Sequence, residues 1–291
     1  MALIAVLWIT SLLALMAAGI GSSSRTAARL AFNHVENAKA RLSADAGVQQ
    51  AVYDLLTEVG ARPWQAGGVL HDAVNLNQTE VRILIRDEDG KIDINVSAPE
   101  LLQGLFAAAG LTEEQAGSLA ARLIDYRDKD SDPRPFGAED ADYIAAGRLD
   151  GAADRPFRNV VELSDVLGVS DEIYRRVSPH LTIYSDAEGV DLFRASRSVL
   201  MALPGMTPEA LDTILSVSTT SIENDPLLAL PDDLTRPFED YLLPSRELIF
   251  EIKAVGESNG GGRFIRNAIV ALDGGRDDLP FTIYAWNRGF F

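Results

Sequence analysis

The residues best able to do chemistry in this chain are carboxylates gathered in one short stretch, DYRDKDSDPRPFGAEDAD at positions 125–142. Asp128, Asp130 and Asp132 are spaced two residues apart, so that one loop could wrap them around Ca²⁺, a hard ion that takes about six to eight oxygen ligands. Glu139 stands at position 12 if Asp128 is position 1, but Pro133 replaces the glycine that an EF-hand requires at position 6. The alternative is a solvated acidic loop in which Asp140 caps the next helix.

Signals for catalysis are weak elsewhere. The three histidines, His34, His71 and His180, are scattered, and cysteine is absent. The sequence has no Gly-x-Ser-x-Gly elbow and no phosphate-binding loop. The segment Leu203–Met206 is similar to the hairpin of helix-hairpin-helix DNA binders, although a structural use fits this acidic chain better. A calcium-dependent enzyme using the acidic loop therefore stays open as an alternative function.

The charge balance narrows the possible partners. Of the 291 residues, 47% are hydrophobic and 24% are charged, which is typical of a folded protein rather than a disordered one. The formal net charge is −17, and Lys and Arg are interspersed with acids. Such a surface repels phosphate backbones, so we expect no nucleic-acid partner, and a membrane-tethered DNA receptor is the least favoured function. Divalent cations suit the surface better.

The N-terminus predicts a membrane helix. Residues 1–24 carry no ionisable side chain, and the apolar run begins at Met1 itself. About 20 apolar residues at 1.5 Å each cover roughly 30 Å, the thickness of the hydrocarbon core of a bilayer. The alternatives are a cleaved signal peptide, which would have a basic start and a shorter apolar core, and a buried core helix, which would rarely be apolar on all sides for so long. Since a positive flank normally sets orientation, we expect that a short basic leader preceded Met1.

The same helix is predicted to continue to about Val59, because the first proline is Pro63. Its second half is amphipathic, and its apolar side chains are predicted to pack on a globular head. This stripe consists of Ala31, Val35, Ala38, Leu42, Ala46, Val52, Leu56 and Val59.

The remaining pattern predicts an α+β fold. Strands are expected at Glu80–Arg86, Glu247–Val255, Arg263–Leu272 and Phe281–Trp286, with a hairpin turn at Glu257–Gly262. Helices are expected at Glu100–Ala109, Glu113–Tyr126, Ala138–Ala146, Val160–Leu167 and Asp171–Val177, with Thr112 and Ser170 as N-caps. We therefore divide the chain into a membrane half of the helix (1–24), an amphipathic helix with the first strands (25–95), an inserted helical domain (96–184), and a second hairpin repeat with the last strands (185–291).

The second hairpin repeat rests on internal similarity. The segment beginning at Gly90 aligns with the one beginning at Gly189, with small gaps, and Asp93 then matches Asp191. Each copy is an extended segment that leads into a helix and then a second helix, which is the layout of a helical hairpin. Chance similarity between amphipathic helices is the alternative.

With these features together, the sequence resembles the K-type minor pseudopilins (GspK family) of bacterial type II secretion systems. The matching segments are ALIAVLW at 2–8, GKIDIN at 90–95 with PELL at 99–102, DYRDKD at 125–130, RPFGAEDADY at 134–143, VEL at 161–163 and SPHLTIY at 178–184. The match extends over nearly the whole chain, and the Gly-Ala-Glu-Asp block is its most specific part.

The resemblance implies a pilin-like fold, in which a long N-terminal helix packs on an antiparallel sheet and a large helical domain is inserted. It implies that prepilin peptidase removes the leader and that Met1 is then N-methylated. Most pseudopilins carry Glu at mature position 5, where this chain has Ala5, as K-type members do. Without that acid, a subunit cannot form an ion pair with the N-terminal amine of a subunit above it. A subunit at the filament tip needs no such pair.

For function, the resemblance implies a subunit that caps the pseudopilus, helps to start the filament and supports protein export across the outer membrane. The implied partners are the other minor pseudopilins and the major pseudopilin, and the implied location is the bacterial inner membrane, single-pass, with the head in the periplasm. A structural Ca²⁺ is implied at Asp128, Asp130, Glu139 and Asp140, with Asp125 and Asp132 as further candidate ligands. A signal-anchored periplasmic calcium-dependent enzyme or a tethered binding protein is the alternative.

Overall fold

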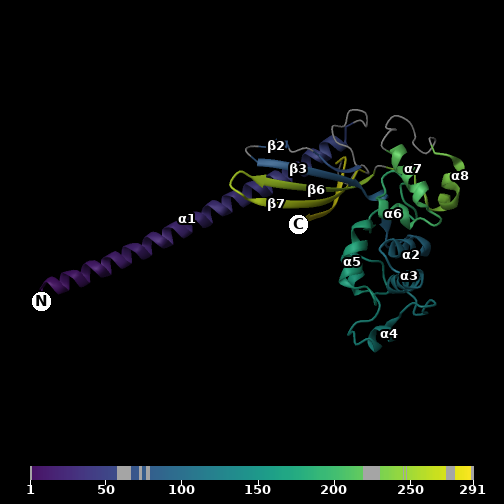
Figure 1. The fold of residues 1–291 in the computed structure, drawn as a ribbon, viewed down its shortest axis with the longest axis horizontal. Coiled ribbons are helices and arrows are strands. Elements are labelled where there is room, and N and C mark those ends of the chain that lie inside the picture. The colour runs from purple at the N-terminus through teal and green to yellow at the C-terminus, as the bar shows by residue number, and fades with distance from the viewer. Residues whose placement is uncertain are drawn as a thin grey trace.

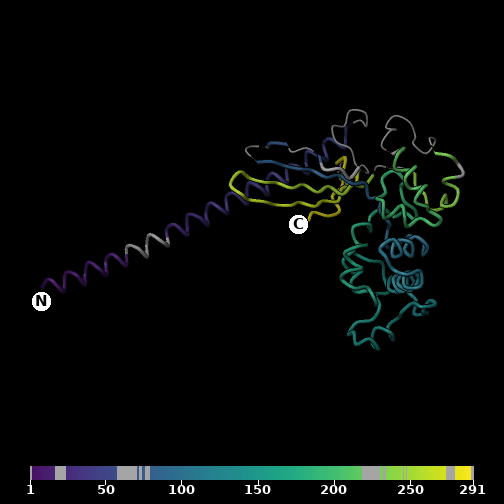
Figure 2. Tube along the Cα trace, in the orientation of Figure 1, coloured from purple at the N-terminus to yellow at the C-terminus, as the bar shows by residue number. Residues whose placement is uncertain are grey.

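The computed structural model of the chain describes residues 2–57, 67–71, 74–76, 79–218, 230–244, 246, 248–272 and 279–289. Three parts follow one another along the longest axis in Figure 1: a projecting N-terminal helix, a sheet against which the end of that helix packs, and a block of short helices. The tube in Figure 2 shows that residues from the first and the last thirds of the chain build the sheet together. The α+β class and the packing of a long helix on an antiparallel sheet are confirmed.

The long helix α1 is continuous from Ala2 to Leu55, slightly shorter than the predicted end at Val59. Its last five turns bury mainly small residues against the sheet, including Ala40, Ala44 and Ala51, each fully buried. The predicted contact stripe is wrong for its exposed members and right for Val52, while Val59 lies outside the described residues. The exposed members are Ala31, Val35, Ala38, Leu42, Ala46 and Leu56.

The reason for this correction is the closeness of the helix to the sheet. A Cβ added at Gly256 would lie 2.2 Å from the carbonyl oxygen of Ala40, and one at Gly262 would lie 2.4 Å from that of Glu36. Only small side chains fit between backbones at this separation, so Val35 and Leu42 are turned outward, whereas Val48, Val52 and Leu55 are buried farther along the helix.

The sheet is antiparallel and has the strand order β1-β3-β6-β7-β8, with β2 also pairing with β3. Its strands are β1 (Gly67–Leu70), β2 (Val74–Leu76), β3 (Thr79–Asp87), β6 (Ile249–Ser258), β7 (Arg263–Ala271) and β8 (Thr282–Arg288). Alternate residues of β3 and β6 are buried against α1, as expected for a sheet with one covered face. The four predicted strands and the hairpin between β6 and β7 are confirmed.

The block of helices is inserted between β3 and β6. Its helices are α2 (Pro99–Ala108), α3 (Glu113–Arg127), α4 (Asp140–Ala145), α5 (Asp171–Val177), α6 (Arg197–Ala202), α7 (Pro208–Ser218) and α8 (Asp232–Thr235). Short 3₁₀ turns η2 (Glu88–Gly90), η3 (Val160–Asp165), η4 (Ser178–His180) and η6 (Arg236–Tyr241), and a two-strand parallel pair of β4 (Ile92–Asp93) and β5 (Leu181–Thr182), complete it.

One apolar core holds this block together and runs from Ile92 to Phe238. The predicted division at 184/185 passes through that core, because the second hairpin packs with the helical block. The predicted helix at 160–167 is instead the 3₁₀ turn η3, which Asn159 starts by accepting the N–H of Val161. The Thr112 and Ser170 caps are confirmed by side chains that accept the N–H groups of Gln115 and Ile173.

The two repeat segments share a local structure. Asp93 accepts the N–H of Asn95 at 2.8 Å, and Asp191 accepts that of Phe193 at 2.9 Å. Helices α2 and α6 each begin six residues after the aspartate. The copies also contact each other, since the N–H of Asp191 donates to the carbonyl oxygen of Asp89 at 2.7 Å. This agreement in turn type and spacing supports a true repeat over chance similarity.

The close crossing of α2 and α6 gives a prediction. A Cβ at Gly104 would lie 2.0 Å from the carbonyl oxygen of Ala202, whereas one at Gly117 on α3 would meet only Gln103, at 3.7 Å. We expect Gly104→Ala to lower the free energy of unfolding by about 2 kcal/mol, because neither backbone can yield. Gly117→Ala, the matched control, should raise it by up to about 1 kcal/mol through helix propensity. Urea unfolding measures both, and equal effects would contradict the crossing.

The sheet and the helical block meet through buried charges. The Nζ of Lys91 lies 2.6 Å from Glu88 and 2.9 Å from Glu251 of β6. Asp89 accepts two hydrogen bonds from Arg246, whose guanidinium also donates to the carbonyl oxygen of Ser185 at 2.8 Å. Since these groups are satisfied by one another, the junction fixes the orientation of the two parts more strictly than apolar contact would.

Across the residues that the structure describes, we find no helix with both the length and the apolar character needed to cross a membrane. Met1, the predicted processing site, lies outside the described residues. Ala5 lies within α1 and is exposed.

Candidate metal site

The candidate metal site is built where helix α3 ends and helix α4 begins. Asp128 is the first residue beyond α3, and its extended backbone turns the chain away from the helix axis. Glu139 precedes α4, and its N–H is accepted by Asp142 at 3.0 Å. The two ends of the loop at 128–139 are therefore fixed by helix termini, and their carboxylates are carried toward each other.

Three of the predicted ligands converge. Asp128, Asp130 and Glu139 each place one carboxylate oxygen within 4.8 Å of the others. Oxygens that bind one Ca²⁺ at about 2.4 Å can be at most about 4.8 Å apart, so the group has the size of a calcium site. Carboxylate oxygens are also the ligands that this hard cation prefers.

Two atoms of the group lack a hydrogen-bond partner. Within the described part of the chain, the buried Oδ1 of Asp128 and the buried Oε1 of Glu139 accept no hydrogen bond. Buried carboxylate oxygens are normally paired, because leaving them bare costs free energy. Desolvation, followed by the charges of Asp125 and Asp128, raises the pKa of Glu139 to about 7. A bound cation would coordinate both oxygens and replace the repulsion between the carboxylates with attraction to the ion. These residues therefore fit a calcium ion.

Asp125 supports the loop from beneath. It is fully buried and accepts the backbone N–H groups of Arg134, at 3.1 Å, and Ala138, at 3.0 Å. The guanidinium of Arg134 lies 2.9 Å from Asp125 and also contacts Asp128. Gly137 is required here, since a Cβ would lie 1.8 Å from the Asp125 carboxylate. Asp125 therefore shapes the site without belonging to the converging group.

The other two predicted ligands have different surroundings. Asp132 donates its backbone N–H to Asp130 at 3.1 Å, and its carboxylate is outside the converging group. Asp140 accepts the N–H of Ala152 at 2.9 Å, and Gly151 leaves room for that carboxylate. Asp140 thus ties the following loop to the start of α4.

Asp154 is an acidic residue near the site that the sequence pattern did not indicate. Its backbone has a positive φ of 50°, and its N–H donates to the carbonyl oxygen of Tyr126 at 3.2 Å. Desolvation and the charges of Asp140 and Asp128 raise its pKa, which shows that its carboxylate shares their field. Since Asp154 lies outside the acidic stretch, only the return of the chain to α3 reveals it.

The support by Asp125 gives a prediction. Oδ2 of Asp125 accepts both backbone N–H groups, so in Asp125→Asn the amide oxygen can keep them only by turning its NH₂ group toward the guanidinium of Arg134, and one of the two sets of contacts is lost. We expect the free energy of unfolding to fall by about 2 kcal/mol, the cost of leaving buried donors unsatisfied. Denaturant unfolding measures it, with the exposed Asp171→Asn as control. A change below about 0.5 kcal/mol, the range of ordinary surface substitutions, would contradict the role of Asp125.

Comparisons with known proteins agree with this architecture. The family model described as type II secretion system (T2SS), protein K matches residues 73–186, which include the whole acidic loop. Type II secretion system protein K of Pseudomonas aeruginosa is 30% identical over 146 residues, which are 47% of this chain and 44% of that protein. The match therefore spans less than half of the length of this relative.

Among solved structures, a chain of the GspK-GspI-GspJ complex from enterotoxigenic Escherichia coli superposes with a TM-score of 0.62 and 16% identity. The superposition covers 92% of this chain and 100% of that one, so the two share a fold. These comparisons agree with the resemblance stated from the sequence: residues 73–186 match the type II secretion system protein K family, and the chain shares the fold of the solved chain.

Proposed function

We propose that the chain is a minor pseudopilin that caps the tip of the type II secretion pseudopilus and assembles there with other minor pseudopilins and the major pseudopilin. The observation that carries this is the outward apolar face of α1. Its large side chains there are between 42% and 69% exposed: Leu30, Phe32, Val35, Leu42, Tyr53 and Leu56. Large apolar side chains exposed in this number along a helix of a folded protein indicate an interaction surface.

The position of this face favours helix-to-helix assembly. The sheet packs on one side of the C-terminal part of α1 (Figure 1), and Val35, Leu42 and Tyr53 stay exposed there. The solved structure with the same fold is a complex that contains GspI and GspJ. On this basis we propose that subunits of those two kinds pack their own helices along Val35 and Leu42.

The start of α1 supports the proposed location. From Leu3 to Met16 its large apolar side chains are all more than half exposed. An apolar surface on all sides of a helix needs an apolar environment, which the inner membrane supplies before assembly and neighbouring helices supply afterward. We propose that processing at Met1 precedes assembly and that Ala5, which carries no acid, leaves no charge for a subunit above.

We propose a structural Ca²⁺ held by Asp128, Asp130 and Glu139. Bound there, the ion would neutralise a cluster that the fold otherwise holds together against repulsion, and it would fix the loop between α3 and α4. We propose a structural role for the ion because the matched family and relative are components of a secretion system.

The experiment is co-purification of the full chain in detergent with subunits of the GspI and GspJ type from the same bacterium. The double variant Val35→Ser, Leu42→Ser should fall at least tenfold in capture, while its thermal midpoint stays unchanged because both side chains are more than half exposed. Val161→Ser, 56% exposed on the helical block, is the matched control and should be captured normally. Full capture of the double variant would refute assembly through this face.

A further inference from the structure

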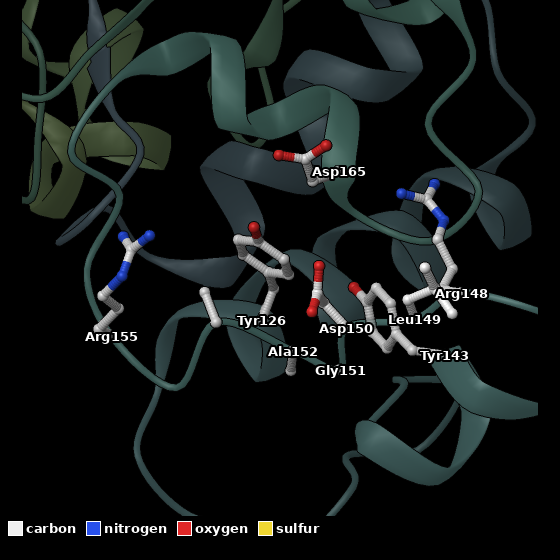
Figure 3. A pocket seen from close by; sticks show the side chains of 10 residues that line it. Tyr126, Tyr143, Arg148, Leu149, Asp150, Gly151, Ala152, Arg155 and Asp165 are labelled. Atoms are coloured by element: carbon white, nitrogen blue, oxygen red, sulfur yellow. The ribbon is translucent and has the colours of Figure 1, made fainter.

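A cavity of about 380 Å³ lies beside the acidic loop and is separate from the converging carboxylates. Figure 3 shows its walls: Tyr126 from α3, Tyr143 from α4, the loop at 148–155, and Asp165 from η3. Small-molecule and side-chain sites have volumes of about 300–1,000 Å³, so the cavity is large enough for one long side chain and part of its backbone.

The hydroxyl of Tyr126 is the first sign of a ligand. Tyr126 is 6% exposed, its ring stacks on Phe157 with centroids 5.1 Å apart, and its hydroxyl points toward Asp165. Within the part of the chain that the structure describes, no hydrogen bond to this hydroxyl is formed. By contrast, the hydroxyl of Tyr143 accepts the N–H of Leu167 at 3.1 Å. The ring of Tyr126 is therefore buried while its hydroxyl opens onto the cavity, where a ligand can reach it.

The charges around the cavity decide the kind of partner. Arg155 is already paired with Glu162 at 2.8 Å, which cancels its charge. Asp150 and Asp165 form no ion pair with any described residue, and Figure 3 shows both carboxylates facing the space above the tyrosine rings. Arg148 lies on the opposite side and likewise has no ion pair among the described residues. The two unpaired acids outnumber the one unpaired base, and the acidic loop lies next to them. The cavity therefore favours a positively charged ligand.

We propose that this cavity binds a basic side chain, lysine or arginine, presented by a partner protein. The charged group would lie between Asp150 and Asp165 and donate to the hydroxyl of Tyr126. Its aliphatic stem would lie on the rings of Tyr126 and Tyr143, which attract cations as well as apolar groups. The site goes beyond the proposed function, since neither the calcium ligands nor the outward face of α1 takes part.

The test titrates the full chain in detergent, at saturating calcium, with Nα-acetyl-lysine methylamide. Tyrosine rings labelled with ¹³C report binding, and Tyr126→Phe identifies the signal of Tyr126. We expect a saturable shift of that signal with the lysine probe. The norleucine analogue, which has the same stem without the ammonium, should give none, and neither should Nα-acetyl-glutamate methylamide.

Two variants test the acids. Asp150→Asn and Asp165→Asn should each weaken binding about fivefold, the upper range for a partly exposed ion pair. Asp240→Asn, a matched exposed acid on η6, should leave it unchanged. Tyr126→Phe should weaken binding without lowering the thermal midpoint, because it removes an unpartnered hydroxyl; a purely structural tyrosine would lower the midpoint instead.

Three outcomes would overturn the proposal. Equal binding of norleucine and lysine would show a merely apolar cavity. Preferred binding of the glutamate probe, lost in Arg148→Ala, would show an anion site. No saturable shift with any probe would remove the site altogether. None of these outcomes bears on capture by the partner subunits, so failure here and failure of the proposed assembly can be told apart.

Discussion

At pH 8, Asp87→Asn is expected to raise the free energy of unfolding by roughly 4 kcal/mol, since each tenfold change in the acid dissociation constant corresponds to about 1.4 kcal/mol. Asp87 is 3% exposed at the junction between β3 and the helical block. Desolvation raises its pKa to about 7, and the charges of Asp89 and Asp191 add to this while Arg194 opposes it. Its Oδ1 accepts the N–H of Asp89 at 3.0 Å, an interaction that asparagine can keep.

The direction in which stability changes with pH follows from which state binds the proton. Below pH 3.8 the group is protonated in both the folded and the unfolded chain, so it costs nothing. Between pH 3.8 and about 7 the unfolded chain releases the proton first, and the folded state loses stability steadily as the pH rises. Above pH 7 the buried charge imposes its full cost. The chain is therefore most stable with respect to this group at low pH, and that stability is lost as the pH rises from 3.8 to about 7.

The measurement is urea unfolding of the natural chain and the variant at intervals from pH 4 to pH 8. The difference between them should grow with pH and level off above about 7. Asp212→Asn, whose side chain is 71% exposed, is the matched control and should show no such trend. A pH-independent difference, or one that is larger at pH 4, would show that Asp87 is not held in its neutral form.

Adding Ca²⁺ at about 100 times its dissociation constant should stabilise the chain by about 2.7 kcal/mol and raise the thermal midpoint on the order of 5 to 10 °C. The reason is that the ion would bind the folded carboxylates of Asp128, Asp130 and Glu139, whose oxygens the fold has already brought together. A chelator should return the midpoint to its starting value, which differential scanning calorimetry can follow.

The control lies in the same loop. Asp128→Asn and Glu139→Gln should each abolish most of the calcium-dependent rise, whereas Asp132→Asn should preserve it, because Asp132 is outside the converging group. Any of the three removes one negative charge, so a general electrostatic effect would affect all of them alike. An equal loss in Asp132→Asn, or no rise in the natural chain, would count against the site.

The acidic loop shows what spacing can and cannot predict. The spacing of Asp128, Asp130 and Asp132 indicated a loop for a cation, and the structure brings the first two together with Glu139, which the resemblance implied. The supporting role of Asp125 was not predictable, because it depends on Arg134 and Ala138 folding back over it. The same is true of Asp154, which comes near the loop only through the path of residues 147–155.

The face of α1 shows the opposite case. Its continuity and length follow from the sequence, since helix propensity and the absence of proline act locally. The choice of buried face does not, because apolar periodicity favoured Val35 and Leu42, while the sheet selected Ala40 and Ala44. Periodicity registers how apolar a side chain is, but a close approach of backbones selects for small volume.

By itself, then, the sequence determined the long N-terminal helix, the main strands, the helical hairpins and the acidic loop, because each depends on residues close together in the chain. Only the tertiary structure decided which face of α1 is left for partners, which carboxylates converge and which support them, and how Lys91 and Arg246 join the two parts. These outcomes depend on desolvation and on distances between segments far apart in sequence, which no local pattern encodes.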